Sequence, residues 1–369
     1  MNGRVLLVWV VSVAATMAIW SSPSVACTGI TLKAGDGAVV GGRTMEWGSF
    51  DIGSQLVTIP RGYPFAGLTP DGKPGMSWKT KYGIVGLDAL GKDIIVDGMN
   101  EKGLIVGLFY HPGYASYPKY DPSKAAETMA PTDVGQYLLS TCATAAEARS
   151  AIAKVRVVPV VEPALGFPAP VHYLVTDASG KAIVIEFLKG ELKVFDAPLG
   201  VLTNAPSYDW HETNMRNFIN LSPVALPDKK LENLDFKPLG GGSGMIGLPG
   251  DFTPPSRFVR AVAFSQTARP TKTGGETMYE FFRILDNFNV PLGAAEGTGK
   301  DATAGLRSAT AWTSCYDTKN KVMYYHTQHN RRVRKVDLKR IDFSKLSRLK
   351  RQPLDKEERE DMDDVTPRG

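Results

Sequence analysis

Cys27 stands at the position in this sequence that is best suited to covalent chemistry. A positive charge near the start of the chain is followed by an apolar run over residues 5–20, and the small residues Ser24 and Ala26 precede the cysteine. A charged start, a short apolar core and a small-x-small ending are typical of a secretory signal peptide, whereas a membrane anchor needs a longer run. We therefore expect residues 1–26 to be cleaved and Cys27 to begin the mature chain.

Three interpretations of Cys27 are open from its position alone. The first is a structural residue, either buried or joined in a disulfide. The second is a lipidated cysteine, but a lipoprotein signal usually has a leucine-like residue where this chain has Ser24. The third is an N-terminal nucleophile, because a free α-amine with a pKa of about 8 is a built-in base for the neighbouring thiol. The thiolate is the reactive form of cysteine.

Arg43 and Glu46 are expected to lie beside Cys27. Two predicted strands, residues 28–34 and 38–45, flank a Gly-Asp-Gly turn and form a hairpin whose second strand returns to the cysteine. A guanidinium at that place would favour the thiolate, and a carboxylate would hold the α-ammonium. An ordinary surface ion pair between Arg43 and Glu46 explains the two residues equally well.

The order of the other predicted elements indicates an α+β fold. Strands come in hairpins and meanders and helices in separate blocks, a pattern typical of antiparallel sheets with helices outside. The further strands are expected at 82–87, 93–96, 104–110, 171–176, 182–187, 192–195, 310–316 and 322–327. The helices are expected at 132–139, 144–155, 209–220, 256–266 (capped by Ser256) and 277–288.

The charge distribution suggests one domain followed by a tail. The 369 residues carry a net charge of +5, and basic residues gather between 331 and 351 ahead of an acidic stretch at 355–364. We expect a single domain over 27–345 and a charged tail over 346–369. Nucleic-acid binding would require a basic face with a recognisable motif, which the sequence lacks, so no nucleic-acid partner is expected.

The remaining cysteines and histidines give no sign of a metal centre. Three cysteines are too few for a disulfide scaffold, and whether Cys142 pairs with Cys315 stays open. His326 and His329 fall on a predicted strand, where residues three apart point to opposite faces and cannot jointly bind an ion. We expect neither a metal nor a cofactor.

Several ordered motifs resemble the choloylglycine hydrolase family, which holds the bile salt hydrolases and penicillin V acylases. The matching strings are CTG at 27–29, GRTME at 42–46, DGMNEKGL at 97–104, GVLTN at 200–204, GLPGDFTP at 247–254, SRF at 256–258 and TSC at 313–315. They extend over most of the expected mature chain. The resemblance implies an N-terminal nucleophile hydrolase, a four-layer αββα sandwich of two antiparallel sheets.

The resemblance also implies a role for each matched residue. Cys27 matches the nucleophile, and Arg43 matches the arginine beside it. Asn204 matches the asparagine whose amide donates to the oxyanion, and Arg257 matches the second active-site arginine. Tyr110 lies where bile salt hydrolases tend to have Asn and penicillin V acylases Tyr, and its backbone N–H would be the second oxyanion donor.

Glu46 departs from the family pattern, and the neighbouring Trp47 has two interpretations. The family usually has Asp where this chain has Glu46, and the extra methylene moves the carboxylate by about one bond length while keeping the charge. We expect Glu46 still to contact the α-amine or Arg43. Trp47 can either line the substrate pocket or fill the core.

The expected activity is hydrolysis of a non-peptide amide by a periplasmic or secreted enzyme. The Cys27 thiolate attacks the carbonyl, the α-amine passes its proton to the leaving amine, and water cleaves the thioester. Tyr110 and the export signal resemble the penicillin V acylase side of the family in its Gram-negative form. Acyl-homoserine-lactone acylase activity is a related possibility, and bile salt hydrolysis is the alternative.

The expected partners follow from the same resemblance. The substrate is a small-molecule amide, family members commonly form homotetramers, and no stable membrane association is expected after cleavage. A lipidated, non-catalytic binding protein of the same fold is the alternative from another functional class, because lipidation of Cys27 would consume its thiol and acylate its amine. An unlipidated homologue that has lost its activity is a third option.

Overall fold

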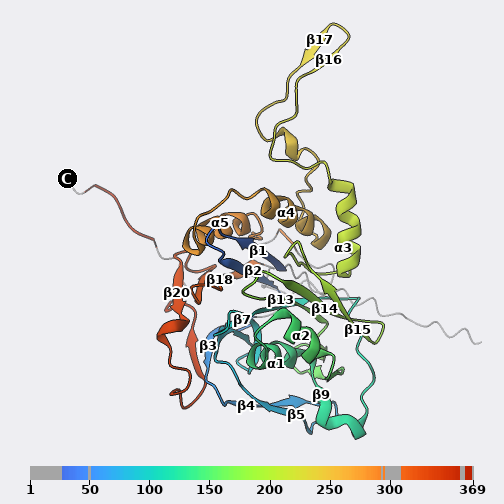
Figure 1. Ribbon diagram of the computed structural model, residues 1–369, viewed down its shortest axis with the longest axis vertical. Coiled ribbons are helices and arrows are strands. Elements are labelled where there is room, and N and C mark those ends of the chain that lie inside the picture. The colour runs from blue at the N-terminus through green and yellow to red at the C-terminus, as the bar shows by residue number, and fades with distance from the viewer. Residues whose placement is uncertain (1–26, 49–50, 292–293, 296–308, 358–361, 368–369) are drawn as a thin grey trace, which may run out of the picture.

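Two antiparallel sheets lie face to face in the computed structural model, and helices cover the outer side of each (Figure 1). The structure describes residues 27–48, 51–291, 294–295, 309–357 and 362–367. The expected signal peptide over 1–26 lies outside these described residues. Within them, no helix is both long and apolar enough to cross a membrane.

The first sheet contains the N-terminal hairpin and has the strand order β1-β2-β18-β19-β20. Its strands are β1 (Cys27–Lys33), β2 (Val39–Trp47), β18 (Ala309–Asp317), β19 (Val322–Thr327) and β20 (Arg334–Asp337). Cys27 pairs with Met45 across the hairpin, so the second strand returns to the cysteine as the sequence predicts.

The second sheet has the order β15-β14-β13-β8-β7-β6-β3-β21. In chain order its strands are β3 (Gln55–Ile59), β6 (Ile84–Ala89), β7 (Ile94–Asn100), β8 (Ile105–Tyr110), β13 (Val171–Thr176), β14 (Ala182–Leu188), β15 (Glu191–Asp196) and β21 (Lys350–Pro353). Short pairs complete the structure: β4 (Pro64–Leu68) with β5 (Pro74–Lys79), β9 (Thr128–Met129) with β10 (Arg156–Val157), β11 (Val161–Glu162) with β12 (Phe167–Pro168), and β16 (Lys229–Leu231) with β17 (Leu234–Phe236).

Four helices form the outer layers and complete the predicted αββα arrangement. Helices α1 (Val134–Thr141) and α2 (Ala145–Ile152) pack on the second sheet, against β7, β8, β13 and β14. Helices α4 (Pro254–Thr267) and α5 (Gly274–Asp286) pack on the first sheet, against β1, β2 and β18. The α+β sandwich expected from the sequence is therefore confirmed.

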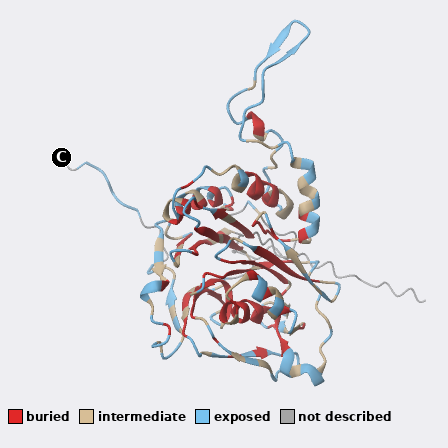
Figure 2. Ribbon diagram, viewed as in Figure 1, coloured by how far each residue is buried: buried red, intermediate tan, exposed pale blue. Residues whose placement is uncertain are grey.

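The buried residues of the two sheets and their helices (red in Figure 2) include two clusters of apolar side chains. One cluster joins the first sheet and its helices to the inner face of the second sheet, and the other joins the outer face of the second sheet to α1 and α2. Strand β14 shows the alternation, because Val184 belongs to the first cluster and Ile183 and Ile185 to the second. Cys315 and Cys142 lie in different clusters, and all three cysteines are free.

The helix boundaries differ from the predicted ones where turn residues were misjudged. Helix α4 begins at Pro254 after the N-cap residue Thr253, not at Ser256, because proline suits the first helical turn. Thr273 caps α5 by accepting a hydrogen bond from the backbone N–H of Glu276. Helix α3 (Tyr208–Met215) ends earlier than expected and continues as a short 3₁₀ turn.

Strand β21 places part of the expected charged tail inside the second sheet. It pairs with β3, so the sheet continues past residue 345 to Pro353. Arg351 donates to Asp88 at 2.8 Å and also to Asp93. The run of charged residues obscured an edge strand, because strands at the edge of a sheet tolerate charged side chains.

The contact between Arg351 and Asp88 leads to a testable prediction about the stability of the protein. We expect Arg351→Ala to lower the free energy of unfolding by about 1.5–3 kcal/mol, the range for a hydrogen bond to a charged group, because the Asp88 carboxylate is buried. Chemical denaturation measures the loss. Lys350→Ala, at an exposed position of the same strand, is the control, and equal stability of the two variants would contradict the role given to Arg351.

Candidate active site

Cys27 begins β1 on the face of the first sheet that meets the second sheet. Its side chain is buried, with 1% of the residue exposed, and its Sγ lies 2.7 Å from Nη2 of Arg43, which donates to it. Its backbone N–H donates to Oδ1 of Asn204 at 2.9 Å. Both potential reactive groups of Cys27 are thus held by neighbouring side chains.

The Arg43 guanidinium is fixed on several sides. Its Nη1 donates to the carbonyl of Leu108, its Nε donates to Thr44 O at 3.1 Å, and it lies 4.2 Å above the ring of Phe109. These contacts fix a positively charged hydrogen-bond donor next to the Cys27 sulfur.

A backbone bridge between β1 and the residues that precede Asn204 brings Asn204 close to Cys27. Gly29 and Leu202 exchange two hydrogen bonds, of 2.8 and 3.1 Å. Oδ1 of Asn204 accepts from Cys27 N–H and from Arg257 Nη2, which orients the amide so that Nδ2 donates to Tyr110 O at 2.7 Å. The amide nitrogen has two hydrogens, so a second N–H remains to stabilise an oxyanion.

Tyr110 is the last residue of β8 and lies next to Asn204. The N–H and C=O of one residue in an antiparallel strand point to the same side, and the carbonyl of Tyr110 faces Asn204. The Tyr110 N–H is therefore expected on the side where Asn204 lies. The phenol packs edge-on against Trp47, and burial raises the pKa of Tyr110 to about 12, so the ring is neutral.

Arg257, in the second turn of α4, ties the same groups together from the other face of the first sheet. It is fully buried and donates to the carbonyl of Cys27, to Thr28 Oγ1 at 3.0 Å and to Asn204 Oδ1 at 2.7 Å. Burial lowers its pKa to about 10, which the charge of Glu46 opposes, so the guanidinium remains protonated at neutral pH.

Glu46 does not make the hydrogen bonds expected from the sequence. Its carboxyl accepts from Thr310 at 2.6 Å and from Thr44 at 3.1 Å, instead of from the Cys27 nitrogen or Arg43. The cause is strand alternation, because β2 points Arg43 to one face of the sheet and Glu46 to the other. Burial raises the pKa of Glu46 to about 7 against the hydrogen bonds and the charges of Arg257 and Arg43.

A small, almost wholly apolar cavity of about 70 Å³ opens beside the Cys27 sulfur. Side chains from β2, β7, β8 and the neighbouring loops line it; among them are Met45, Trp47, Leu90, Val96, Leu108 and Tyr110. Trp47 is therefore a cavity-lining residue rather than a core-filling one. The cavity suits an apolar group attached to the carbonyl that Cys27 would attack.

Comparison with known proteins assigns the chain to a family. The family model described as linear amide C-N hydrolases, choloylglycine hydrolase family, matches residues 27–355. The chain belongs to the choloylglycine hydrolase family. Over 318 residues it is 31% identical to the bile salt hydrolase/transferase of Clostridium perfringens, covering 85% of this chain and 92% of that protein.

Solved structures of other choloylglycine hydrolases share the fold. A mutant conjugated bile acid hydrolase from Clostridium perfringens superposes with a TM-score of 0.79 at 28% identity and covers 92% of this chain and 99% of its own. Penicillin V acylase from Agrobacterium tumefaciens gives a TM-score of 0.70 at 25% identity, with 88% and 90% covered. The chain is therefore a linear amide C-N hydrolase that acts on small molecules.

Sequence reasoning missed a second group of polar residues in this choloylglycine hydrolase. His111, His172, Glu186 and His211 are all fully buried, directly behind Asn204. The available signal was a polar residue within an apolar strand, as in VHYLVT and AIVIEFL, because a buried polar group needs a partner.

The position of Asn204 predicts the effect of removing its amide. Asn204→Ala should lower kcat by at least about 10²-fold, since the oxyanion loses a donor, while alkylation of Cys27 by iodoacetamide should continue. Steady-state kinetics and mass spectrometry measure the two rates. Asn217→Ala, an exposed asparagine, is the control. A wild-type kcat in Asn204→Ala would show that Asn204 does not bind the oxyanion.

Proposed function

We propose that this chain is an exported amidase in which Cys27, released as the first residue by cleavage after Ala26, is the nucleophile. The observation that carries the proposal is the double fixation of Cys27, with its sulfur on Arg43 and its nitrogen on Asn204. Cleavage would turn that backbone nitrogen into an amine at the same place. A thiolate and a base would then lie on one residue, at the mouth of an apolar cavity.

The proposed reaction assigns a task to each neighbouring group. The Cys27 thiolate attacks the amide carbonyl, and the oxyanion accepts hydrogen bonds from Asn204 Nδ2 and the Tyr110 N–H. The α-amine takes the proton of the Cys27 thiol and transfers it to the leaving amine, and water then hydrolyses the thioester to release the acid and restore the thiol. Arg257 holds Asn204 in place, and the Glu46 carboxyl, when ionised, offsets part of the charge of the two buried arginines.

Penicillin V acylase-like activity is our first choice of substrate class, with acyl-homoserine lactones as related substrates. The apolar cavity of about 70 Å³ beside Cys27 has room for the apolar end of an acyl group next to the amide. Tyr110 and Trp47 form an aromatic wall for such a group.

Bile salt hydrolysis is the second candidate, and the sequence comparisons favour it. The bile salt hydrolase/transferase of Clostridium perfringens matches almost its whole length. A bile salt would have to seat its steroid outside the cavity and present only its amide to Cys27. The two candidates share the nucleophile and differ in the acyl group.

A periplasmic or secreted homo-oligomer without a membrane anchor is the proposed form of the mature enzyme. The hairpin of β16 and β17 projects from the body of the protein (Figure 1). Its apolar side chains Leu231, Leu234 and Phe236 are 50%, 63% and 50% exposed. Exposed apolar groups gathered on a projecting segment favour contact with another subunit.

A direct substrate comparison tests the amidase proposal. The mature protein and Cys27→Ser should be given penicillin V, a glycine-conjugated bile salt and a long-chain acyl-homoserine lactone. We expect Cys27-dependent release of free amine, fastest from penicillin V. Fastest release from the bile salt would support the second candidate. A lipid on Cys27, found by mass spectrometry, together with no release from any substrate, would support the non-catalytic alternative.

Replacing the apolar residues of the projecting hairpin tests the assembly. Light scattering of the mature protein should give the mass of a tetramer, and Leu234→Ser with Phe236→Ser should give a smaller species, because the hairpin would lose its apolar contacts. Lys229→Ser, an exposed polar position on the same hairpin, is the control. A monomeric wild-type protein would contradict the proposed assembly.

A further inference from the structure

Three histidines hold the segment that carries Asn204. Each of them has Nε2 within hydrogen-bond distance of a backbone carbonyl. The contacts are His172 to Thr203 at 3.1 Å, His211 to Asn204 at 3.0 Å and His111 to Pro206 at 3.2 Å. A carbonyl oxygen only accepts hydrogen bonds, so Nε2 of each ring must carry a proton.

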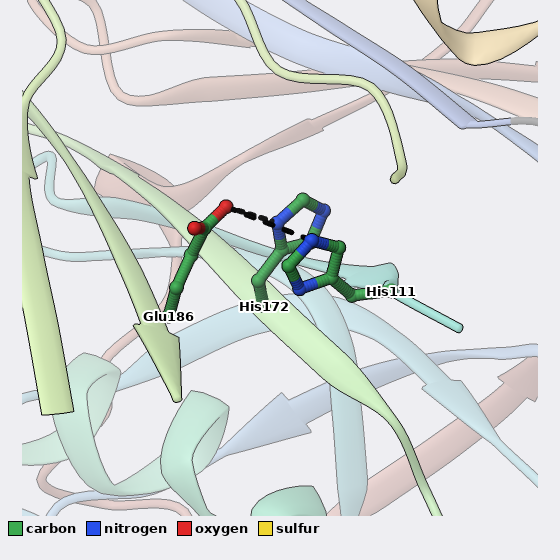
Figure 3. Close-up of side chains that lie close together, drawn as sticks. All are labelled: His111, His172 and Glu186. Carbon is green, nitrogen blue, oxygen red and sulfur yellow. Dashed lines mark hydrogen bonds and ion pairs between the residues drawn. The ribbon is translucent and has the colours of Figure 1, made fainter. Parts of the chain in front are cut away.

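Glu186 fixes the proton count of one of these rings. Its Oε1 lies 2.9 Å from Nδ1 of His172 (Figure 3). Because Nε2 of His172 already donates to Thr203, a single proton between Nδ1 and Oε1 satisfies both atoms. The backbone N–H of Tyr208 donates to the same carboxyl, at 3.1 and 3.3 Å to its two oxygens.

The surroundings favour the neutral form of this pair. Burial raises the pKa of Glu186 to about 7 and lowers that of His172 to about 3, so the proton stays on Glu186 and is donated to His172. The titratable and charged groups that face the pair are Arg43 on β2, His111 after β8, and Asp209 and His211 on α3. The Arg43 charge opposes an imidazolium, and Asp209 opposes a carboxylate.

The same residue types can hold a metal ion, but their arrangement favours the hydrogen-bonded pair. The rings of His111 and His172 stack at 4.0 Å with an angle of 7° between their planes (Figure 3). A ring nitrogen binds an ion in the plane of its ring, at about 2.0–2.1 Å for zinc. An ion in the plane of one stacked ring lies out of the plane of the other.

We propose that Glu186 and His172 are positioning residues that hold Asn204 at the oxyanion through one shared proton. The inference rests on the proposed function, in which Asn204 stabilises the oxyanion. When Glu186 loses its proton, a carboxylate faces the lone pair of His172 Nδ1. The repulsion turns the ring, the carbonyl of Thr203 loses its donor, and Asn204 moves away from its place beside Cys27.

A pair of substitutions at Glu186 tests the shared proton. In Glu186→Gln the amide N–H₂ donates to His172 and the amide oxygen accepts from Tyr208, without titrating. Glu186→Leu can do neither, so its kcat should fall about 10- to 100-fold with little change in KM, as for a misplaced catalytic group. Glu186→Gln should restore kcat at low pH, and Glu191→Gln, an exposed position on β15, is the control.

The pH dependence of kcat distinguishes the shared proton from a merely structural role of Glu186. Deprotonation of Glu186 should lower wild-type kcat as the pH rises through about 7, and Glu186→Gln should lose this part of the decline. Glu46 has a pKa in the same range, so Glu46→Gln is measured alongside. A Glu186→Leu variant with wild-type kcat and pH profile would overturn the proposal.

A measurement without turnover separates this inference from the proposed function. In Cys27→Ala, nitrogen-15 NMR should show His172 protonated at Nε2, with its Nδ1 signal shifting as Glu186 titrates. An unprotonated Nε2, or a stoichiometric metal ion lost in His172→Phe, would overturn the shared proton. If the wild type hydrolyses no amide but the NMR result holds, the proposed function fails and the hydrogen-bonded pair remains.

Discussion

The guanidinium of Arg43 is buried between the two sheets, where an uncompensated charge costs on the order of several kcal/mol. Its compensation comes from the Cys27 sulfur, the Leu108 carbonyl and the face of Phe109. Asp97, also buried, adds a negative charge nearby, and burial raises its pKa to about 6 against the effect of Arg43. The Cys27 sulfur is one of the groups that surround this buried charge, which ties the packing of the sandwich to its chemistry.

Segments far apart in the sequence meet at this charge. The hairpin of β1 and β2 brings Arg43 to Cys27, the bridge at Gly29 brings the Asn204 segment, and α4 brings Arg257. Behind them, buried histidines hold the backbone of the Asn204 segment through its carbonyls. The site is thus a set of fixed backbone and side-chain donors around one cysteine, and the apolar cavity leads to it.

Local patterns in the sequence predicted much of this arrangement. The hairpin that joins Cys27 to Arg43 follows from alternation and a glycine turn, and most central strands lie where they were expected. The same alternation could have placed Glu46 on the opposite face of the sheet from Arg43, because the two residues are three positions apart on one strand. Cys27 pairs with Met45, so Arg43 shares the face of Cys27. Asn204 and Arg257 came from family motifs, because no local pattern connects residues so distant in the chain.

The remaining features depend on tertiary contacts that no single segment encodes. His172, Glu186 and His211 lie on three separate elements and His111 in the loop after β8, and only the packed fold brings them together. Strand β21 was expected to be tail because its charged residues are typical of solvent-exposed segments, yet Arg351 is partnered by the carboxylates of Asp88 on β6 and Asp93 in the turn before β7.

In the proposed mechanism Cys27 acts with both its thiol and its own amine. The most direct measurement compares the amide hydrolysis rate of a chain that begins at Cys27 with that of a chain that retains Ala26, both verified by mass. We expect the extended chain to be slower by at least about 10²-fold, the contribution of a general acid–base group, because its amide nitrogen cannot transfer a proton. Equal rates would contradict the proposed mechanism.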